Sequence, residues 1–297
     1  MVNRERLKKI LILTLYSGEN ELAESLEVLS KQTYTNWEHK IISSLPNKEA
    51  HETLYFYIMS QSSGFDLFIK LDADMVLIGS DALASIVRFF ASNPNVDQAN
   101  FAVHDVLSDS RIMGLLVFSN KAKWFENRDD LFVDHTPVIP GKRLLIWGTP
   151  APVALHCPNP HSFQAFHFGA HRAMKALQRN RTRKNWIQSA LQWHLLMQVW
   201  RRFLVQQTRE LGLFMLGAYS VWRGEIDGKG NEYQNASLKK AYDKYEILDS
   251  RSVLNLLREE WACVLAKHDL LYVFLWPRIK FYKFRSRISV WLNKAGD

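Results

Sequence analysis

Runs of apolar residues alternate with amphipathic segments along the first part of the chain. The runs are short and rich in branched apolar residues, which predicts strands, and the segments between them repeat apolar residues every three or four positions, which predicts helices. The predicted strands are residues 8–16, 37–43, 66–71 and 113–119, and the predicted helices are residues 19–30, 49–59, 81–90 and 121–127. Strands and helices in regular alternation predict an α/β fold with a parallel sheet of βαβ units.

The pattern changes in the second half of the chain. Residues 144–171 contain no Asp, Glu, Lys or Arg and are rich in proline and histidine, which predicts a non-helical segment over a surface or beside a pocket. From residue 171 onward the pattern is helical. Trp186, Trp193 and Trp200 recur every seven residues as one apolar stripe of a long helix, for which core packing is the favoured explanation. Residues 237–267 predict one or two further amphipathic helices.

Charge divides the chain at about the same place. Residues 1–170 hold 15 Lys and Arg against 19 Asp and Glu, whereas residues 171–297 hold 23 against 11. We therefore expect an α/β region over residues 1–170 and a basic helical region over residues 171–297. The basic region suits an anionic or membrane-held partner.

Membrane spans and disulfides are not predicted. The apolar run after the basic N-terminus is short and leads into acidic residues, so a first strand is preferred to a signal peptide. No apolar run reaches the length of a membrane span. Cys157 and Cys263 are far apart and are expected to be free thiols, which favours a cytoplasmic protein.

Two carboxylates follow the third predicted strand. Asp72 and Asp74 are spaced so that both side chains point to one side, at the strand end where ligands bind in open α/β sheets. Carboxylates are hard oxygen ligands suited to Mg²⁺ or Mn²⁺ carrying nucleotide phosphates. The alternative is an acidic turn before the next helix.

Several spaced elements in residues 8–135 resemble one family. The opening strand, Gln32-Thr33-Tyr34 with Asn36-Trp37, and Lys70-Leu-Asp-Ala-Asp74 resemble the nucleotide-binding half of GT-A glycosyltransferases, most of all the bacterial family 2 type. No glycine-rich dinucleotide or P-loop signature follows the first strand. The chain departs from family 2 at Ile42-Ser43-Ser44, where that family often has acidic residues.

The resemblance implies a GT-A fold, with a Rossmann-like and mostly parallel sheet, that binds a UDP-, GDP- or dTDP-sugar. It places Thr14, Tyr16, Lys70 and Asp72 against the nucleotide sugar. It also implies Asp72 and Asp74 as ligands of Mn²⁺ or Mg²⁺.

The segment Asp129-Asp-Leu-Phe-Val-Asp134 resembles the acceptor-side acidic segment of family 2, where a carboxylate acts as the base. Asp134 or Asp130 is the implied base. Pro137 stands where the second Asp of that family is expected, so an exposed acidic loop remains the alternative.

A second likeness points to the retaining family 8 branch. His167-Phe-Gly169 followed by Arg172 resembles its His-x-Gly-x-x-Lys signature, with Arg in place of Lys. The likeness implies His167 as a third metal ligand and Arg172 as a diphosphate contact at the start of a helix. Family 2 implies inversion of the sugar and family 8 implies retention, and the sequence leaves both open.

The tail alternates aromatic and basic residues over 270–291, which suits the headgroup layer of an anionic membrane. A basic helix docked on the protein is the equal alternative.

The sequence therefore predicts a metal-dependent glycosyltransferase of the hexosyltransferase type. Its acceptor would be a saccharide or a lipid-linked molecule, as in bacterial surface polysaccharide synthesis, and its location would be the cytoplasm or the inner face of the membrane. The rivals are a sugar-phosphate nucleotidyltransferase, which lacks its expected basic loop here, and a non-enzymatic binder of membranes or nucleic acid. No RNA-binding motif is present, so no nucleic-acid partner is predicted.

Overall fold

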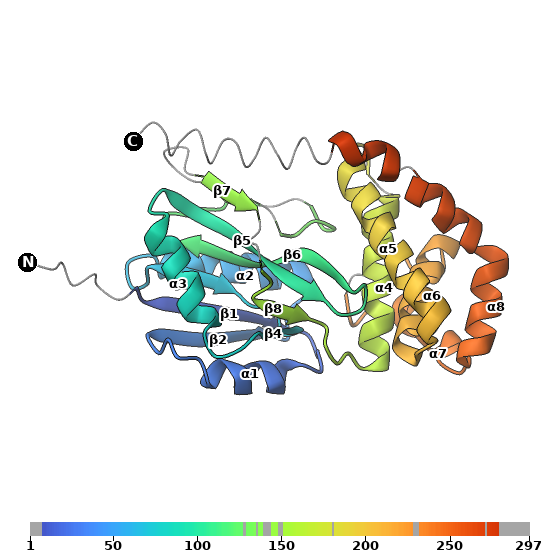
Figure 1. Ribbon diagram of the computed structural model, residues 1–297, viewed down its shortest axis with the longest axis horizontal. Helices are drawn as coiled ribbons and strands as arrows, with labels where there is room; N and C mark the ends of the chain where they lie inside the picture. The colour runs from blue at the N-terminus through green and yellow to red at the C-terminus, as the bar shows by residue number, and fades with distance from the viewer. Residues whose placement is uncertain are drawn as a thin grey trace, which may run out of the picture. The chain divides into compact units, whose positions relative to one another are not determined.

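A computed structural model describes most of the chain, namely residues 8–126, 129–134, 136–138, 144–147, 151–179, 181–227, 232–270 and 272–278. These residues form two compact units (Figure 1). Residues 8–104 and 111–158 make an α/β unit, and residues 105–110 and 159–278 make a helical unit. The helical unit therefore begins before the change of charge at residue 171.

The α/β unit is built on an eight-stranded sheet of order β2-β1-β3-β6-β5-β8-β4, with β7 paired to β5 (Figure 1). The strands are β1 Ile10–Tyr16, β2 Trp37–Ser43, β3 Leu67–Lys70, β4 Met75–Leu77, β5 Val96–Asp105, β6 Ser110–Ser119, β7 Leu144–Trp147 and β8 Ala154–His156. Strand β1 pairs in parallel with both β2 and β3. Strand β6 is antiparallel to β3, and β8 is antiparallel to β4, so the sheet is mixed.

Helices cover both faces of the central strands. Helices α1 Leu22–Ser30, α2 Asn47–Ser60 and α3 Ala82–Ser92 follow β1, β2 and β4. Because side chains alternate along a strand, Ile10 and Ile12 pack in one core cluster with α3, and Leu11 and Leu13 pack in another with α2. This double burial explains the apolar runs at β1 and β3. Because the two strands pair in parallel, their carboxyl ends lie at the same edge of the sheet.

Most local predictions for this unit are confirmed. The α/β class, the first three strands and the first three helices are present with small shifts of their bounds. The predicted helix at residues 121–127 is wrong. In place of a helical turn, Lys123 and Val138 exchange backbone hydrogen bonds of 3.1 and 2.7 Å across an antiparallel bridge.

The helical unit contains α4 Ser162–Leu177, α5 Trp186–Gln206, α6 Arg209–Arg223, α7 Ala236–Tyr245 and α8 Ser250–Glu260. Asparagine, threonine and aspartate side chains cap four of these helices by accepting from backbone N–H groups, at Asn185, Thr208, Asn235 and Asp249. Trp193 and Trp200 are buried as predicted, whereas Trp186, the first residue of α5, is exposed.

Helix α4 begins earlier than the pattern predicts. The His161 side chain accepts a hydrogen bond of 3.1 Å from the backbone N–H of Gln164 and so caps the helix at Ser162. The segment expected to be non-helical up to residue 171 is therefore helical over its last ten residues. Histidine is not among the usual capping residues, which is why the start was missed.

Two glycines allow α4 and α6 to approach closely. A Cβ atom at Gly169 would lie 1.7 Å from the carbonyl oxygen of Phe214, and one at Gly217 would lie 1.9 Å from the carbonyl oxygen of Phe166. Any side chain at either position would force the two helices apart. Gly169, in the His-x-Gly element, therefore serves helix packing.

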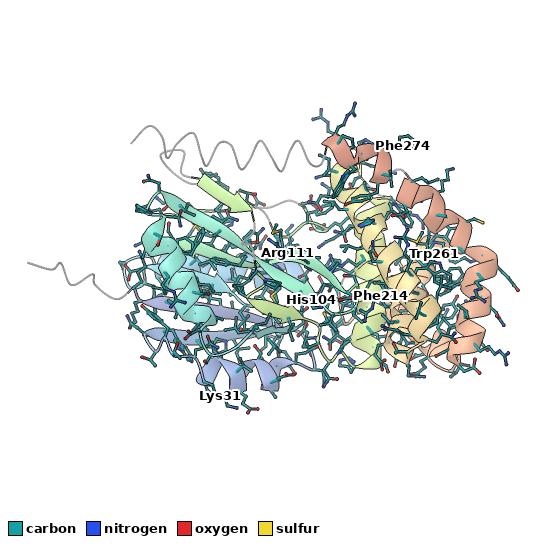
Figure 2. The ribbon with its side chains drawn as sticks, in the orientation of Figure 1. Lys31, His104, Arg111, Phe214, Trp261 and Phe274 are labelled. Carbon is teal, nitrogen blue, oxygen red and sulfur yellow. The ribbon has the colours of Figure 1, made fainter. Side chains whose placement is uncertain are left out.

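The tail is described only as far as residue 278, where residues 262–270 and 272–278 are helical. Tyr272, one of the rings expected to enter a membrane, is buried and stacks on His194 with 3.9 Å between ring centroids. Phe274, labelled in Figure 2, is 79% exposed. Residues 279–291 of the predicted membrane segment lie outside the described residues. In the part of the chain that is described, no helix has the length and apolar character needed to span a bilayer.

Candidate functional site

The paired aspartates lie in a tight connection between β3 and β4. Backbone hydrogen bonds of 3.0 Å from Leu71 to Leu13 and 3.1 Å from Ala73 to Leu15 continue the pairing with β1 beyond the strand. Ala73 is completely buried, and Ala73 and Asp74 form a turn, so the alternation of side chains along a strand does not extend to Asp74. That both carboxylates point to one side stays a prediction. The Asp72 side chain is 26% exposed, whereas Asp74 is buried.

Lys70 is a buried cation between two carboxylates. Its Nζ lies 2.8 Å from Oδ2 of Asp72 and 3.1 Å from Oδ1 of Asp134, and its side chain is 3% exposed. Burial alone would lower the pKa of Lys70, but Asp134 and Asp72 outweigh it and raise that pKa above its usual range. Burial also raises the pKa of Asp72; the Lys70 charge opposes this shift, and the charges of Asp74 and Asp134 reinforce it.

Asp134 is held from several sides, and its side chain is 44% exposed. His51 Nε2 lies 3.2 Å from Asp134 Oδ1, while His51 Nδ1 donates to the carbonyl of Asn47 at 2.8 Å. Asp130, the other predicted base, is 83% exposed, and its Oδ1 lies 3.1 Å from Nζ of Lys48, whose side chain is 37% exposed. The structure therefore fixes Asp134 beside Lys70 and leaves Asp130 on the surface.

Asp74 lies in a cluster with His156 and Cys157. Met75 and His156 are partners in the β4–β8 ladder, and the Cys157 N–H donates to the Asp74 carbonyl at 2.8 Å. Asp74 Oδ2 is 3.4 Å from His156 Nε2, and Cys157 Sγ is 3.2 Å from His156 Nδ1. One ligand atom from each residue falls within 4.8 Å of the others, and all three residues are buried.

The cluster fits a divalent cation. Asp74 Oδ1 is buried without a hydrogen-bond partner among the described residues, which is costly unless a cation or solvent binds there. Carboxylate, imidazole and thiolate are all ligands of divalent metals. Among the described residues, this is the group that could hold a metal ion.

Glu19 adds a further acid at the same edge of the sheet. It follows β1, and its Oε2 accepts from the N–H groups of Ser17 at 2.7 Å and Gly18 at 3.1 Å. Burial, with the charges of Asp74 and Asp72, raises the pKa of Glu19 to about 7 against the lowering effect of the Ser17 hydrogen bond. The edge is therefore strongly acidic, which favours a bound cation.

The predicted nucleotide contacts on β1 differ in their surroundings. Thr14 is buried, and its Oγ1 lies 2.9 Å from Nε2 of His39 on β2. Tyr16 is half-buried at the end of the strand. Their contact with a nucleotide stays a prediction.

His167 and Arg172 lie in the helical unit, whereas Asp72 and Asp74 lie in the α/β unit. His167 is buried in α4, with its ring 4.2 Å from that of Tyr233 between centroids. Arg172 donates to Gln192 Oε1 at 3.2 Å. The prediction that Arg172 starts a helix is wrong, because α4 begins at Ser162. Metal binding by His167 and diphosphate binding by Arg172 stay predictions.

Sequence reasoning missed His156 and Cys157 as partners of Asp74. The short apolar run at residues 153–155 could have predicted a strand that ends at these two residues, as the apolar run before Asp72 does. Their pairing with residues 74 and 75 is a long-range contact that no local pattern shows.

Comparison with known proteins gives only distant likenesses. No protein-family model matches the chain, and no curated protein matches it. Among solved structures, A197 from STIV is 16% identical, with 37% of this chain and 64% of that chain covered and a TM-score of 0.29. A glycosyltransferase involved in the glycosylation of the major capsid of PBCV-1 is 17% identical, with 51% of this chain and 94% of that chain covered and a TM-score of 0.33.

A third structure is the mannosyltransferase PcManGT from Pyrobaculum calidifontis in complex with GDP-Man and Mn²⁺. It is 13% identical, with 97% of this chain and 87% of that chain covered and a TM-score of 0.37. TM-scores this low do not bear on activity, so the function rests on the geometry of the site.

Proposed function

We propose that the chain is a metal-dependent glycosyltransferase that moves a sugar from a nucleotide-diphospho-sugar to a saccharide or lipid-linked acceptor. The observation that carries the proposal is Asp74, which follows β3: its Oδ1 is buried without a hydrogen-bond partner among the described residues, and its Oδ2 lies 3.4 Å from Nε2 of His156. Asp72, Glu19 and Asp134 gather at the same edge, where open α/β sheets bind ligands.

The residues at this edge are proposed to bind either the metal and diphosphate or the nucleotide. A divalent cation bound at Asp74 would offset the negative charge that develops on the leaving diphosphate. Asp72 faces the same ligand and is kept in place by Lys70, at 2.8 Å. Thr14 and Tyr16 are proposed to line the nucleotide side, because β1 ends beside β3.

Asp134 is the proposed base for the acceptor hydroxyl. A base must be accessible to the acceptor and lie beside the bound donor. Asp134 is 44% exposed and pairs with the buried Lys70 that also holds Asp72, whereas Asp130 pairs with Lys48 on the surface. The proton taken from the acceptor would reside on Asp134, whose Oδ1 lies 3.2 Å from His51 Nε2, a ring nitrogen without a hydrogen-bond partner among the described residues. This role belongs to an inverting transfer; a retaining transfer would not need it.

Substitution of the two candidate bases separates them. We expect Asp134→Asn to lower the kcat of sugar transfer on the order of 10²-fold or more, because general base catalysis contributes about that much. Asp130→Asn, on an exposed loop position, is the matched control and should leave kcat unchanged. Equal kcat values for the two variants would remove Asp134 from the chemistry.

Metal-dependent binding of a nucleotide sugar tests the proposal itself. Thermal shift and calorimetry against UDP-, GDP- and dTDP-sugars should show stabilisation that requires a divalent metal and disappears in EDTA. Asp74→Asn should abolish metal-dependent binding and cut turnover on the order of 10²-fold or more. Full turnover in EDTA, or release of pyrophosphate from a nucleoside triphosphate and a sugar phosphate, would contradict the proposed function.

A further inference from the structure

Cys157 is the least expected member of the Asp74 cluster. It is completely buried, and its Sγ lies 3.2 Å from Nδ1 and 3.6 Å from Nε2 of His156. The second thiol, Cys263, is exposed and belongs to no such cluster among the described residues.

The backbone holds Cys157 in an unusual conformation. Its φ of 50° is in the left-handed region, which residues with a side chain seldom adopt. The hydrogen bond from its N–H to the Asp74 carbonyl and the Met75–His156 pairing fix the backbone that leads into Cys157. Strained backbone of this kind persists where the surroundings determine it, and it concentrates at functional sites.

The three side chains offer one oxygen, one nitrogen and one sulfur atom, all within 4.8 Å of one another. Sulfur changes the preference of such a site, because thiolate and imidazole favour Zn²⁺ and Co²⁺, whereas Mg²⁺ and Mn²⁺ favour oxygen ligands. Binding of the metal would convert the Cys157 thiol to a thiolate, with the sulfur–hydrogen bond broken and one proton released to solvent.

We infer that Asp74, His156 and Cys157 form a three-donor metal site in which the Cys157 thiolate is a ligand, and that the site binds Zn²⁺ or Co²⁺ more tightly than Mg²⁺ or Mn²⁺. This names the metal class of the site in the proposed function, and it rests on that function only for the part that the metal takes in sugar transfer. It departs from the sequence-based expectation of Mn²⁺ or Mg²⁺, which considered only carboxylates and a histidine.

Titration of the full chain with Co²⁺ alone tests the thiolate directly. A thiolate–Co²⁺ bond produces a charge-transfer absorption in the near ultraviolet, and a carboxylate or imidazole ligand does not. We expect the wild type and the matched control Cys263→Ser to show this absorption, and Cys157→Ser and Cys157→Ala to lack it. Competition should show Zn²⁺ displacing Co²⁺ at concentrations at least about 10³-fold below those of Mg²⁺, in keeping with the preference of sulfur ligands.

Three outcomes would overturn the inference. They are Co²⁺ binding to the wild type without the near-ultraviolet absorption, retention of that absorption in Cys157→Ser, and displacement by Mg²⁺ as effective as by Zn²⁺. The wild-type spectrum decides the matter even if the Cys157 variants fail to fold. The titration contains no sugar nucleotide, so its outcome does not depend on the proposed function. A thiolate spectrum, together with no sugar transfer in a separate assay of UDP-, GDP- and dTDP-sugars, would refute the proposed function and leave the metal site standing.

Discussion

Replacing Lys70 with methionine is expected to destabilise the α/β unit by about 3 kcal/mol, at the lower end of the range for breaking a buried ion pair. The lower end applies because Asp72 and Asp134, at 26% and 44% exposure, can regain some water when the ammonium is removed. What remains is a group of carboxylates with no buried cation between them. Urea unfolding followed by fluorescence measures the loss.

The loss should depend on pH. The raised pKa of Lys70 means that its contribution is fully present at neutral pH and is lost only at strongly alkaline pH. The pKa of Asp72 is raised in the folded state, and removing Lys70 raises it further, so the folded variant gains stability when this carboxyl is protonated. The difference between Lys70→Met and wild type should therefore grow as the pH rises from about 4.

Lys48→Met is the matched control for Lys70→Met, since it removes a lysine paired with one aspartate at a similar distance of 3.1 Å on the surface. Exposed pairs of this kind contribute little to stability. Its unfolding free energy should match that of the wild type. If both variants lost the same free energy of unfolding, the buried ion pairs of Lys70 would stabilise the fold no more than a surface pair does.

Gly169→Ala is expected to destabilise the helical unit by about 3 kcal/mol, because overpacking at a fixed contact costs about that much. The new Cβ would lie 1.7 Å from the Phe214 carbonyl oxygen, and a backbone atom of a packed helix cannot move away as a side chain can. Gly217→Ala, at 1.9 Å from the Phe166 carbonyl oxygen, should behave alike. Urea unfolding midpoints of the variants measure the effect.

Gly212→Ala provides the comparison within α6. The nearest atom to its new Cβ is a ring carbon of Phe203 at 3.1 Å, and a ring can shift. Alanine is favoured over glycine in helices by about 1 kcal/mol, which offsets the repacking, so the net change should be within about 1 kcal/mol of zero. A Gly169→Ala protein as stable as Gly212→Ala would show that α4 and α6 do not meet so closely.

The sequence predicts those parts of the fold that depend on neighbouring residues. The apolar runs at β1 and β3 show their double burial directly, and the position of Asp72 and Asp74 directly after a buried strand is read from the sequence alone. The role of Lys70 could not be predicted in full, because only one of its partners, Asp72, is a neighbour in the sequence. The other partner, Asp134, lies far along the chain.

Features that depend on distant contacts could not be predicted. His156 and Cys157 join Asp74 only through the pairing of β4 with β8, two three-residue strands too short for a periodic pattern. The sequence placed Gly169 in a His-x-Gly signature, and its packing role was not visible because its neighbour, Phe214, belongs to another helix. In both cases tertiary packing decides what a local motif does.

The hairpin turn between β5 and β6 belongs to the helical unit, although its strands belong to the sheet. Arg202 of α5 donates to the carbonyl oxygens of Val106 and Leu107, residues made long before it on the ribosome. Chains fold from the N-terminus during synthesis. The strands β1, β2, β3, β5 and β6 can therefore pair while the chain is still growing, whereas the turn must keep its carbonyls bonded to water until α5 emerges. The helical unit is thus completed only after translation has passed residue 202, although its first segment, residues 105–110, is made much earlier.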